Sequence, residues 1–314
     1  MGGDRAEGGP AGRDSVGRLR VGRPGHGRSW GERKGHLSMK LWVNGGLYDE
    51  EAARVSVLDH GLTVGDGIFE TVKAERGETF ALTLHLERLT RSARGLGLPD
   101  PDLDEVRRAC AAVLEANPVE LGRLRITYTG GLAPLGSERG DAGPGLVVAV
   151  GATSRRPDTT AVVTVPWTRN ERGALTGLKT TSYAENVVAL ARAKAAGATE
   201  ALFGNTVGRL CEGTGSNVFV VLDGRIHTPP VSSGCLAGIT RALAAEWTGA
   251  VETDLPLEVL ETAEEIFLTS TLRDVQAVHR VDGRALSAEP GPVTAKAMRV
   301  FEERAAADRD PKLG

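Results

Sequence analysis

Hydrophobic and polar residues along the first half of this chain follow two periods, and each period predicts a different kind of element. Apolar residues three or four apart predict helices, and short apolar or alternating runs predict strands. One predicted helix carries Leu86, Leu89, Ala93 and Leu96 on a single stripe and ends near residues 95–99. The other elements are a helix at 102–116, strands at 41–43, 53–57, 68–74, 80–82, 122–128 and 145–150, and a Gly- and Pro-rich loop at 130–145.

The second half mixes the two periods in the same way. It predicts helices at 185–196, 240–248 and 292–307, and strands at 161–166, 200–204, 217–222, 225–228 and 265–269. A polar stretch with Arg155-Arg156-Pro157 between the halves is the best linker candidate. We therefore predict an α+β fold with a small domain at 39–150, an interdomain linker at 151–159, a large domain at 160–308 and a tail at 309–314.

Residues 1–38 are rich in Gly and Arg and have almost no aliphatic periodicity. Such a segment buries too little apolar surface to offset its ordering entropy, so we predict a disordered extension. A basic tail of this kind could instead bind nucleic acid. A third interpretation is that the natural start lies at Met39, where ordered-looking sequence begins.

Composition narrows the range of partners. The formal net charge of -3 gives no reason to expect nucleic acid or an anionic membrane as a partner. Cys110, Cys211 and Cys235 are widely spaced and odd in number, which argues against a disulfide framework or a metal site. No apolar run approaches the ~20 residues that cross a bilayer, and the N-terminus lacks a signal-peptide core. A cytoplasmic location is therefore expected.

Three segments that lie far apart in the sequence carry groups that could hold one cofactor. Lys179 follows a Gly-rich turn, and Glu212 precedes Gly213-Thr214-Gly215. Gly238-Ile239-Thr240 opens a predicted helix with Thr240 as its N-cap, where backbone N–H groups and the helix dipole bind phosphate. A Schiff-base lysine, a carboxylate for a ring nitrogen and a phosphate cup are what pyridoxal 5'-phosphate requires. We therefore predict this cofactor.

Each of these residues also has an ordinary structural interpretation. Lys179 could be a solvated surface lysine, and Glu212 could be a turn residue that supports its neighbouring glycines. The segment 238–240 could be a plain capped helix. Ser270-Thr271 could donate hydroxyl groups to the phosphate or could form an ordinary turn. Arg88 could supply the phosphate counter-charge or could be a solvated helix residue.

As an ordered set, these segments resemble the class IV (fold-type IV) pyridoxal-phosphate enzymes. That family comprises branched-chain aminotransferases, D-amino-acid aminotransferases and 4-amino-4-deoxychorismate lyases. The resemblance covers residues 39–304, which is nearly the whole chain beyond the predicted extension. Its motifs are Asp59-His60-Gly61, Gly65-Asp66-Gly67-Ile68-Phe69-Glu70-Thr71, His85-Leu86-Glu87-Arg88-Leu89, Glu212-Gly213, Ser216-Asn217-Val218-Phe219 and Gly238-Ile239-Thr240-Arg241.

The resemblance implies a small α+β domain and a larger domain with a β-barrel-like core, with the cofactor held between them. It also implies a homodimer whose partner subunit closes the active site. Lys179 would be the Schiff-base lysine and Glu212 the partner of the ring nitrogen. The implied phosphate ligands are Arg88, Ile239, Thr240 and Thr271.

Two further residues bear on the substrate, which is expected to be a small amino compound. Tyr183 lies four residues after the lysine, as in some lyases of this family, whereas branched-chain aminotransferases usually have a tyrosine five residues on. Tyr183 would reach the phenolic oxygen of the cofactor or be a packed aromatic. The arginine and histidine of D-amino-acid enzymes are not evident in residues 128–134. Arg125 is a candidate carboxylate fork, or an edge-strand arginine facing water.

The main prediction is a 4-amino-4-deoxychorismate lyase-like enzyme that releases pyruvate and 4-aminobenzoate, a precursor of folate. The alternative is a class IV aminotransferase that moves the amino group of a branched-chain or related amino acid to 2-oxoglutarate or pyruvate. A third interpretation is a non-catalytic carrier of the cofactor.

Overall fold

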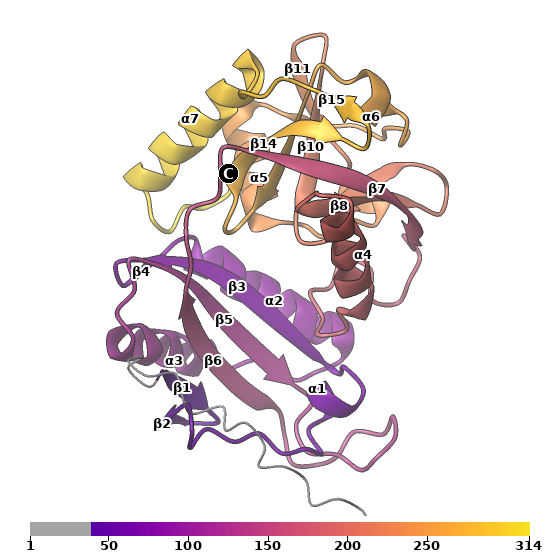
Figure 1. The fold of residues 1–314 in the computed structure, drawn as a ribbon. Coiled ribbons are helices and arrows are strands. Elements are labelled where there is room, and N and C mark those ends of the chain that lie inside the picture. The colour runs from indigo at the N-terminus through magenta and orange to yellow at the C-terminus, as the bar shows by residue number, and fades with distance from the viewer. Residues whose placement is uncertain (1–38) are drawn as a thin grey trace, which may run out of the picture. The chain divides into compact units, whose positions relative to one another are not determined.

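The computed structural model describes residues 39–314, and the predicted disordered extension at 1–38 lies outside them. The first half forms a six-stranded antiparallel sheet in the order β2-β1-β6-β5-β3-β4 (Figure 1). Its strands are β1 (Lys40–Val43), β2 (Gly46–Asp49), β3 (Gly67–Glu75), β4 (Glu78–Thr79), β5 (Leu121–Thr129) and β6 (Gly145–Ala152).

Helices cover one face of this sheet. Helix α2 (Leu82–Leu96) packs on β3, and α3 (Leu103–Ala116) packs on β1 and β6. A short helix, α1 (His60–Thr63), precedes β3. The core beneath the helices is aliphatic, so helix stripe and sheet face bury each other.

Side chains along β3 and β5 alternate between the two faces of the sheet, and only one of these faces is covered by the helices. Ile68 and Val72 of β3, together with Leu124 and Ile126 of β5, are buried in the core under the helices. Successive strand residues point to opposite faces, so the residues between them face the other way. That second face of β3 and β5 is available to line a site.

The second half forms a curled nine-stranded sheet in the order β12-β11-β10-β13-β14-β7-β8-β9, with β15 paired to β14. The pairs β14/β7, β7/β8 and β11/β12 are parallel. The strands are β7 (Thr159–Arg169), β8 (Glu200–Asn205), β9 (Leu210–Gly213), β10 (Asn217–Leu222), β11 (Arg225–Thr228), β12 (Val251–Glu252), β13 (Glu265–Ser270), β14 (Asp274–Val281) and β15 (Arg284–Ala285).

Three longer helices pack on this sheet. Helix α4 (Ala184–Ala195) lies against β7 and β8, α5 (Ile239–Thr248) against β13, and α7 (Pro292–Ala307) against β13 and β14 (Figure 1). The short elements are η1 (Val231–Ser233) and α6 (Val259–Thr262). Within residues 39–314, none of the helices has the length and apolar character needed to cross a membrane.

The two halves share an apolar core. Phe80 and Leu84, at the start of α2, pack in one cluster with Leu243 of α5, Phe267 of β13 and Phe301 of α7. The mixed α/β architecture with a curled second sheet confirms the predicted fold class. The described residues form one compact unit, so the division into domains at 39–150 and 160–308 stays a prediction.

Most predicted elements lie within a few residues of their observed positions, and two do not. Residues 53–57 pair with no strand among the described residues, although Val55 and Val57 alternate with polar neighbours. The predicted strand at 80–82 is wrong, because Ala81 adopts a left-handed conformation and the chain enters α2 there. Strand β14 was not predicted, because Gln276 and His279 interrupt its apolar run.

Candidate active site

A cavity of about 960 Å³ brings the predicted site residues together. Its walls come from the free face of β3 and β5, the segment before α4, strand β9, the start of α5 and the end of β13. All ten predicted residues line it: Lys179, Tyr183, Arg88, Arg125, Glu212, Gly238, Ile239, Thr240, Ser270 and Thr271.

The segment that carries Lys179 extends the first sheet. Phe69 N donates to Lys179 O at 2.9 Å, and Thr181 N donates to Gly67 O at 2.7 Å. From the other side, Lys179 N donates to Ser92 Oγ of α2 at 3.2 Å. The lysine backbone, which belongs to the second half of the chain, is therefore held by the first half.

The Lys179 amine lies over aromatic rings inside the cavity. Its Nζ is 4.2 Å from the ring centroid of Phe69 and 5.6 Å from that of Tyr183. Burial, followed by the positive charge of Arg88, lowers the pKa of Lys179 to about 8. A substantial fraction of this amine is therefore neutral near pH 8, as a nucleophile requires. The interpretation as a freely solvated lysine is wrong.

Glu212 lies on β9 and faces the same cavity. Its Oε2 accepts a hydrogen bond from Leu236 N at 2.9 Å, and its Oε1 is 3.1 Å from Arg169 Nε. Burial raises the pKa of Glu212, and the Arg169 charge opposes that rise. Arg169 itself lies 4.0 Å over the Phe203 ring, which fixes the guanidinium beside the carboxylate.

Arg88 is buried and paired, so its interpretation as a solvated helix residue is wrong. Its Nε and one terminal nitrogen donate to the two carboxylate oxygens of Glu70 at 2.8 and 2.7 Å, and the other terminal nitrogen donates to Ala237 O at 3.0 Å. His85 Nδ1 lies 2.7 Å from Glu70 Oε2. Burial would raise the pKa of Glu70, but Arg88 and His85 outweigh it and lower the pKa to about 2.

The N-terminus of α5 opens on the cavity beside Arg88. Gly238, and not the predicted Thr240, is the N-cap, and it has no side chain to bond the first-turn amides. A Cβ at Gly238 would lie 2.0 Å from Asn217 Oδ1, so this close approach requires glycine. Free first-turn N–H groups and the helix dipole form an anion site.

Hydroxyl groups surround this anion site. Thr271 Oγ1 donates to Thr71 O at 3.1 Å, and Ser270 lies beside it in the cavity wall. Among the described residues, the buried hydroxyls of Ser216 and Thr269 have no hydrogen-bond partner, and both residues line the cavity. Buried polar groups normally find partners, so the cavity is suited to an oxygen-rich ligand.

Tyr183 and Arg125 both contact Phe69. The Tyr183 ring meets the Phe69 ring edge-on at 5.1 Å, and burial, with Glu212 next, raises the pKa of Tyr183 to about 12. The Arg125 guanidinium stacks 3.5 Å over Phe69 from strand β5, which lies between β3 and β6. The interpretation of Arg125 as an edge-strand residue is therefore wrong. Burial lowers the pKa of Arg125 without bringing it a carboxylate among the described residues.

Two residues of the site were not singled out from the sequence. Glu70 is a charged residue inside the apolar run Ile68-Phe69-Glu70-Thr71-Val72, and that interruption was an available signal. Arg169 ends a long strand and has no local signal, because only the curled sheet brings it beside Glu212.

The comparisons with known proteins agree with this geometry. The family model for amino-transferase class IV matches residues 67–281, and the chain belongs to that family. Class IV aminotransferases are enzymes that depend on pyridoxal 5'-phosphate. A hypothetical aminotransferase from Mycobacterium tuberculosis in its cofactor-bound form is similar in structure (TM-score 0.75, 26% identity, 86% of this chain and 100% of that chain).

Individual relatives differ in their named activities. The chain is 34% identical to a provisionally named branched-chain-amino-acid aminotransferase from Methanocaldococcus jannaschii (84% of this chain, 96% of the relative). It is 31% identical to a D-alanine aminotransferase from Staphylococcus haemolyticus (84% and 97%).

Solved structures show the same spread of named activities. A branched-chain aminotransferase from Thermoproteus uzoniensis with norvaline has a TM-score of 0.79 at 29% identity (85% of this chain, 94% of that chain). A provisionally named 4-amino-4-deoxychorismate lyase from Legionella pneumophila has a TM-score of 0.76 at 26% identity (81% and 96%).

The cavity fits the family's cofactor. A partly neutral lysine amine, a buried carboxylate, an uncapped helix N-terminus and unpartnered buried hydroxyls are the groups that an aldehyde, a pyridine nitrogen and a phosphate require. These groups come from four separate segments and meet in one space.

Replacing Glu70 tests the buried pair under Arg88. Glu70→Gln leaves the guanidinium without its carboxylate and should lower the free energy of unfolding at pH 7 by about 3 kcal/mol. The stabilisation by Glu70 is complete above its ordinary pKa of 4.5 and is lost as the pH falls through about 2. The unfolding free energy of the wild type should therefore fall more steeply with acid than that of the variant.

Urea denaturation over a pH series measures both effects. Glu120→Gln, which alters an exposed pair with Arg76, is the matched control and should leave stability nearly unchanged. Equal losses in the two variants would contradict the assigned role of Glu70.

Proposed function

We propose that this chain is an amino-acid aminotransferase in which Lys179 binds pyridoxal 5'-phosphate covalently. The observation that carries the proposal is that the Lys179 amine, the Glu212 carboxylate and the uncapped start of α5 line one cavity. When bound, the cofactor supplies an electron sink that stabilises negative charge at the substrate α-carbon.

Lys179 and Glu212 have the two central roles in this proposal. The Lys179 amine holds the cofactor aldehyde carbon and, once displaced, moves a proton at the substrate α-carbon. Its lowered pKa of about 8 supports both tasks, since the amine must be neutral to act. The Glu212 carboxylate would hold the proton on the ring nitrogen, and Arg169 and Leu236 N orient the carboxylate.

The remaining predicted residues bind the two anionic ends of the complex. The amides of Ile239 and Thr240, with the hydroxyls of Ser270 and Thr271, would hold the phosphate. The bidentate pair with Glu70 orients Arg88 toward the same end of the cavity. Arg125, which stacks on the Phe69 ring that also lies under the Lys179 amine, would bind the substrate carboxylate bidentately.

The comparisons support amino transfer better than the predicted lyase reaction. Both sequence relatives described above carry aminotransferase names, and one solved neighbour carries a lyase name. The lyase stays a second candidate because Tyr183, at the spacing that predicts it, lies against Phe69 in the cavity wall.

We also propose that the enzyme is a homodimer. Segments 55–64 and 132–135 are joined by an Asp59–Leu132 bridge and a hydrogen bond from Ala133 N to Leu58 O. They expose Val57, Leu62 and Leu135, with exposed fractions of 76%, 68% and 79%. Contiguous exposed aliphatic side chains of this kind are typical of an interface.

Removing the lysine amine tests the proposed function. The purified protein should absorb near the visible edge, the band should be bleached by borohydride, and Lys179→Ala should lose both the band and amino transfer. Lys296→Ala, on the exposed side of α7, is the matched control and should retain them. A visible band that survives in Lys179→Ala would contradict the proposal.

A substrate panel separates the two reactions. L- and D-amino acids, including branched-chain amino acids and alanine, are mixed with 2-oxoglutarate or pyruvate, and keto-acid formation is measured. Transfer to the keto acid is expected. Release of pyruvate and 4-aminobenzoate from aminodeoxychorismate, without any transfer, would replace the aminotransferase with the lyase.

Neutralising Glu212 tests its role at the ring nitrogen. Glu212→Gln should lower kcat by about 100-fold with little change in cofactor content, because the carboxylate charge acts mainly in the transition state. Loss of the acid limb of the pH–rate profile is also expected in Glu212→Gln. The raised pKa of Glu212 means that this carboxylate is protonated at a higher pH than an ordinary glutamate. Glu264→Gln, whose carboxylate binds backbone amides of the β10–β11 turn, is the control with wild-type kcat.

Sedimentation velocity tests the homodimer. The wild type should sediment as a dimer, and Leu62→Glu with Leu135→Glu should shift it to a monomer by placing charges in the apolar contact. Val251→Glu, a similarly exposed residue on β12, should leave the dimer intact. A monomeric wild type would rule the dimer out.

A further inference from the structure

Two supports hold the segment around Lys179, and both belong to the first half of the chain. The first is the start of β3, which pairs with residues 179–181. The second is α2, where Ser92 Oγ accepts a hydrogen bond from Lys179 N. On the same helix, Gly95 packs against the Leu178 side chain, and a Cβ added at Gly95 would lie 2.4 Å from the tip of that side chain.

The turn that leads into β3 is itself bonded to the lysine segment. Gly65 O accepts hydrogen bonds from Thr181 Oγ1 at 3.0 Å and Ser182 Oγ at 3.2 Å. Gly65 has a φ of 72°, and a Cβ there would lie 2.6 Å from Ser182 Oγ, so the close approach requires glycine. Asp66 follows directly. Its backbone bonds His60 O and Gly130 N, and its side chain points to Arg139.

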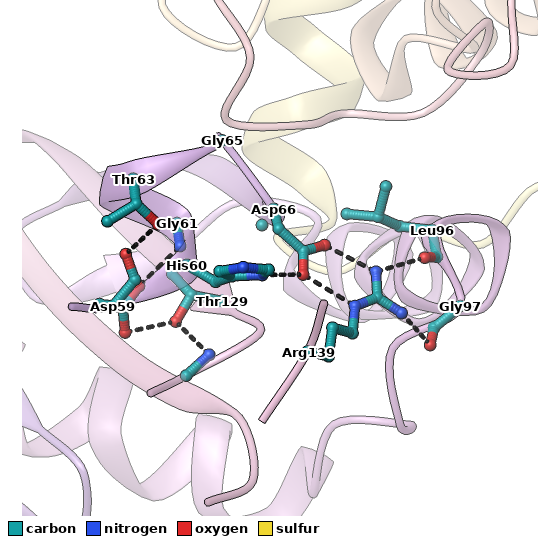
Figure 2. A network of polar contacts seen from close by, with 12 residues as sticks. Asp59, His60, Gly61, Thr63, Gly65, Asp66, Leu96, Gly97, Thr129 and Arg139 are labelled. Carbon is teal, nitrogen blue, oxygen red and sulfur yellow. Dashed lines mark hydrogen bonds and ion pairs between the residues drawn. The ribbon is translucent and has the colours of Figure 1, made fainter. Parts of the chain in front are cut away.

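Figure 2 shows where that side chain goes. Arg139, from the loop between β5 and β6, donates to both oxygens of Asp66 at 2.8 and 2.6 Å. The same guanidinium donates to Leu96 O at 2.7 Å and Gly97 O at 2.6 Å, the last carbonyls of α2. Arg139 therefore ties the end of one support directly to the start of the other.

His60 is a further member of this network, bonded to Asp66 (Figure 2). Its Nδ1 lies 3.0 Å from Asp66 Oδ2, and its Nε2 lies 3.0 Å from Gly136 O. Carboxylate and carbonyl oxygens only accept hydrogen bonds, so the two imidazole nitrogens face two acceptors. The Arg139 hydrogen bonds lower the pKa of Asp66, which keeps it ionised for both partners.

We propose that Arg139 and Asp66 are positioning residues for Lys179. These contacts form a closed loop. Arg139 bonds the Asp66 side chain, and the turn that contains Asp66 bonds residues 179–182. Those residues contact Ser92 and Gly95 of α2, and the end of α2 bonds Arg139 again. Neither side chain lines the cavity, so each acts through the backbone that it fixes. This proposal rests on the proposed role of Lys179 as the residue that binds the cofactor.

Cutting the closed chain at Arg139 should loosen the lysine without unfolding the protein. The Arg139 side chain is 37% exposed, so Arg139→Gln creates no buried cavity. Amide exchange at Phe69, Lys179 and Thr181 should accelerate by about tenfold, because their bonds join the two supports. A lysine held less accurately should lower kcat by about tenfold at unchanged KM.

The experiment uses the full-length protein with its cofactor. Hydrogen exchange is followed in peptides covering 67–69 and 179–181, together with kcat, KM and the sedimentation coefficient. Arg94→Gln is the matched control, because Arg94 makes an exposed bidentate pair with Asp100 at the same end of α2. Arg139→Lys, which keeps the charge but not the fork, should give an intermediate exchange rate.

The outcomes separate this proposal from the proposed function. Faster exchange at both peptides in Arg139→Gln, with wild-type exchange in Arg94→Gln and an unchanged sedimentation coefficient, supports the positioning role. Wild-type exchange in Arg139→Gln, acceleration confined to 130–144, or equal acceleration in Arg94→Gln overturns it. A wild type without a borohydride-sensitive band would remove the proposed function instead. The exchange result would still test whether Arg139 and Asp66 hold the segment at 179–181. If Arg139→Gln does not fold, wild-type exchange in Arg139→Lys overturns the proposal.

Discussion

The active-site cavity depends on the backbone pairing between residues 179–181 and the start of β3. The lysine segment belongs to the second half of the chain, whereas Phe69, Ser92 and Arg88 belong to the first half. Two amide hydrogen bonds and the shared apolar core around Phe267 and Phe301 hold the halves in register. This pairing places the Lys179 amine over Phe69, in the cavity that Glu212 also lines.

Two of the charged side chains that line the cavity, Arg88 and Glu212, are each paired with an opposite charge. Glu70 neutralises Arg88 on the helix side of β3, and Arg169 offsets the burial of Glu212 on the other wall. Burial, and after it the positive charge of Arg88, lowers the pKa of Lys179. The lowered pKa of Lys179 makes the neutral amine accessible near pH 8, and Arg169 limits the rise that burial causes in the pKa of Glu212.

Because side chains alternate along a β-strand, one strand can contribute both to the apolar core and to the cavity. In β3, alternate side chains enter the helix-covered core, and their neighbours Phe69 and Thr71 face the cavity. Glu70 lies on the core side and still serves the site, because its partner Arg88 spans from α2 to the cavity wall. A network based on Arg139 extends this support to a loop that never reaches the cavity.

The sequence by itself determined the class of fold, most helices, and many of the side chains that line the candidate site. Helical periodicity located α2, α3 and α7 well, because an amphipathic stripe is a local property of the chain. Lys179, Glu212 and the Gly238 segment were recognisable because each is marked by neighbouring glycines or a helix start.

Only the tertiary structure decided which charges are paired and which strands exist. The apolar alternation at 53–57 has no partner strand, and β14 forms despite its polar residues because its neighbours on both sides supply hydrogen bonds. Arg169 and Arg139 have no local signature, since their partners lie 43 and 73 positions away along the chain. Contacts of that separation depend on how sheets curl and loops return, and no window of local sequence contains that information.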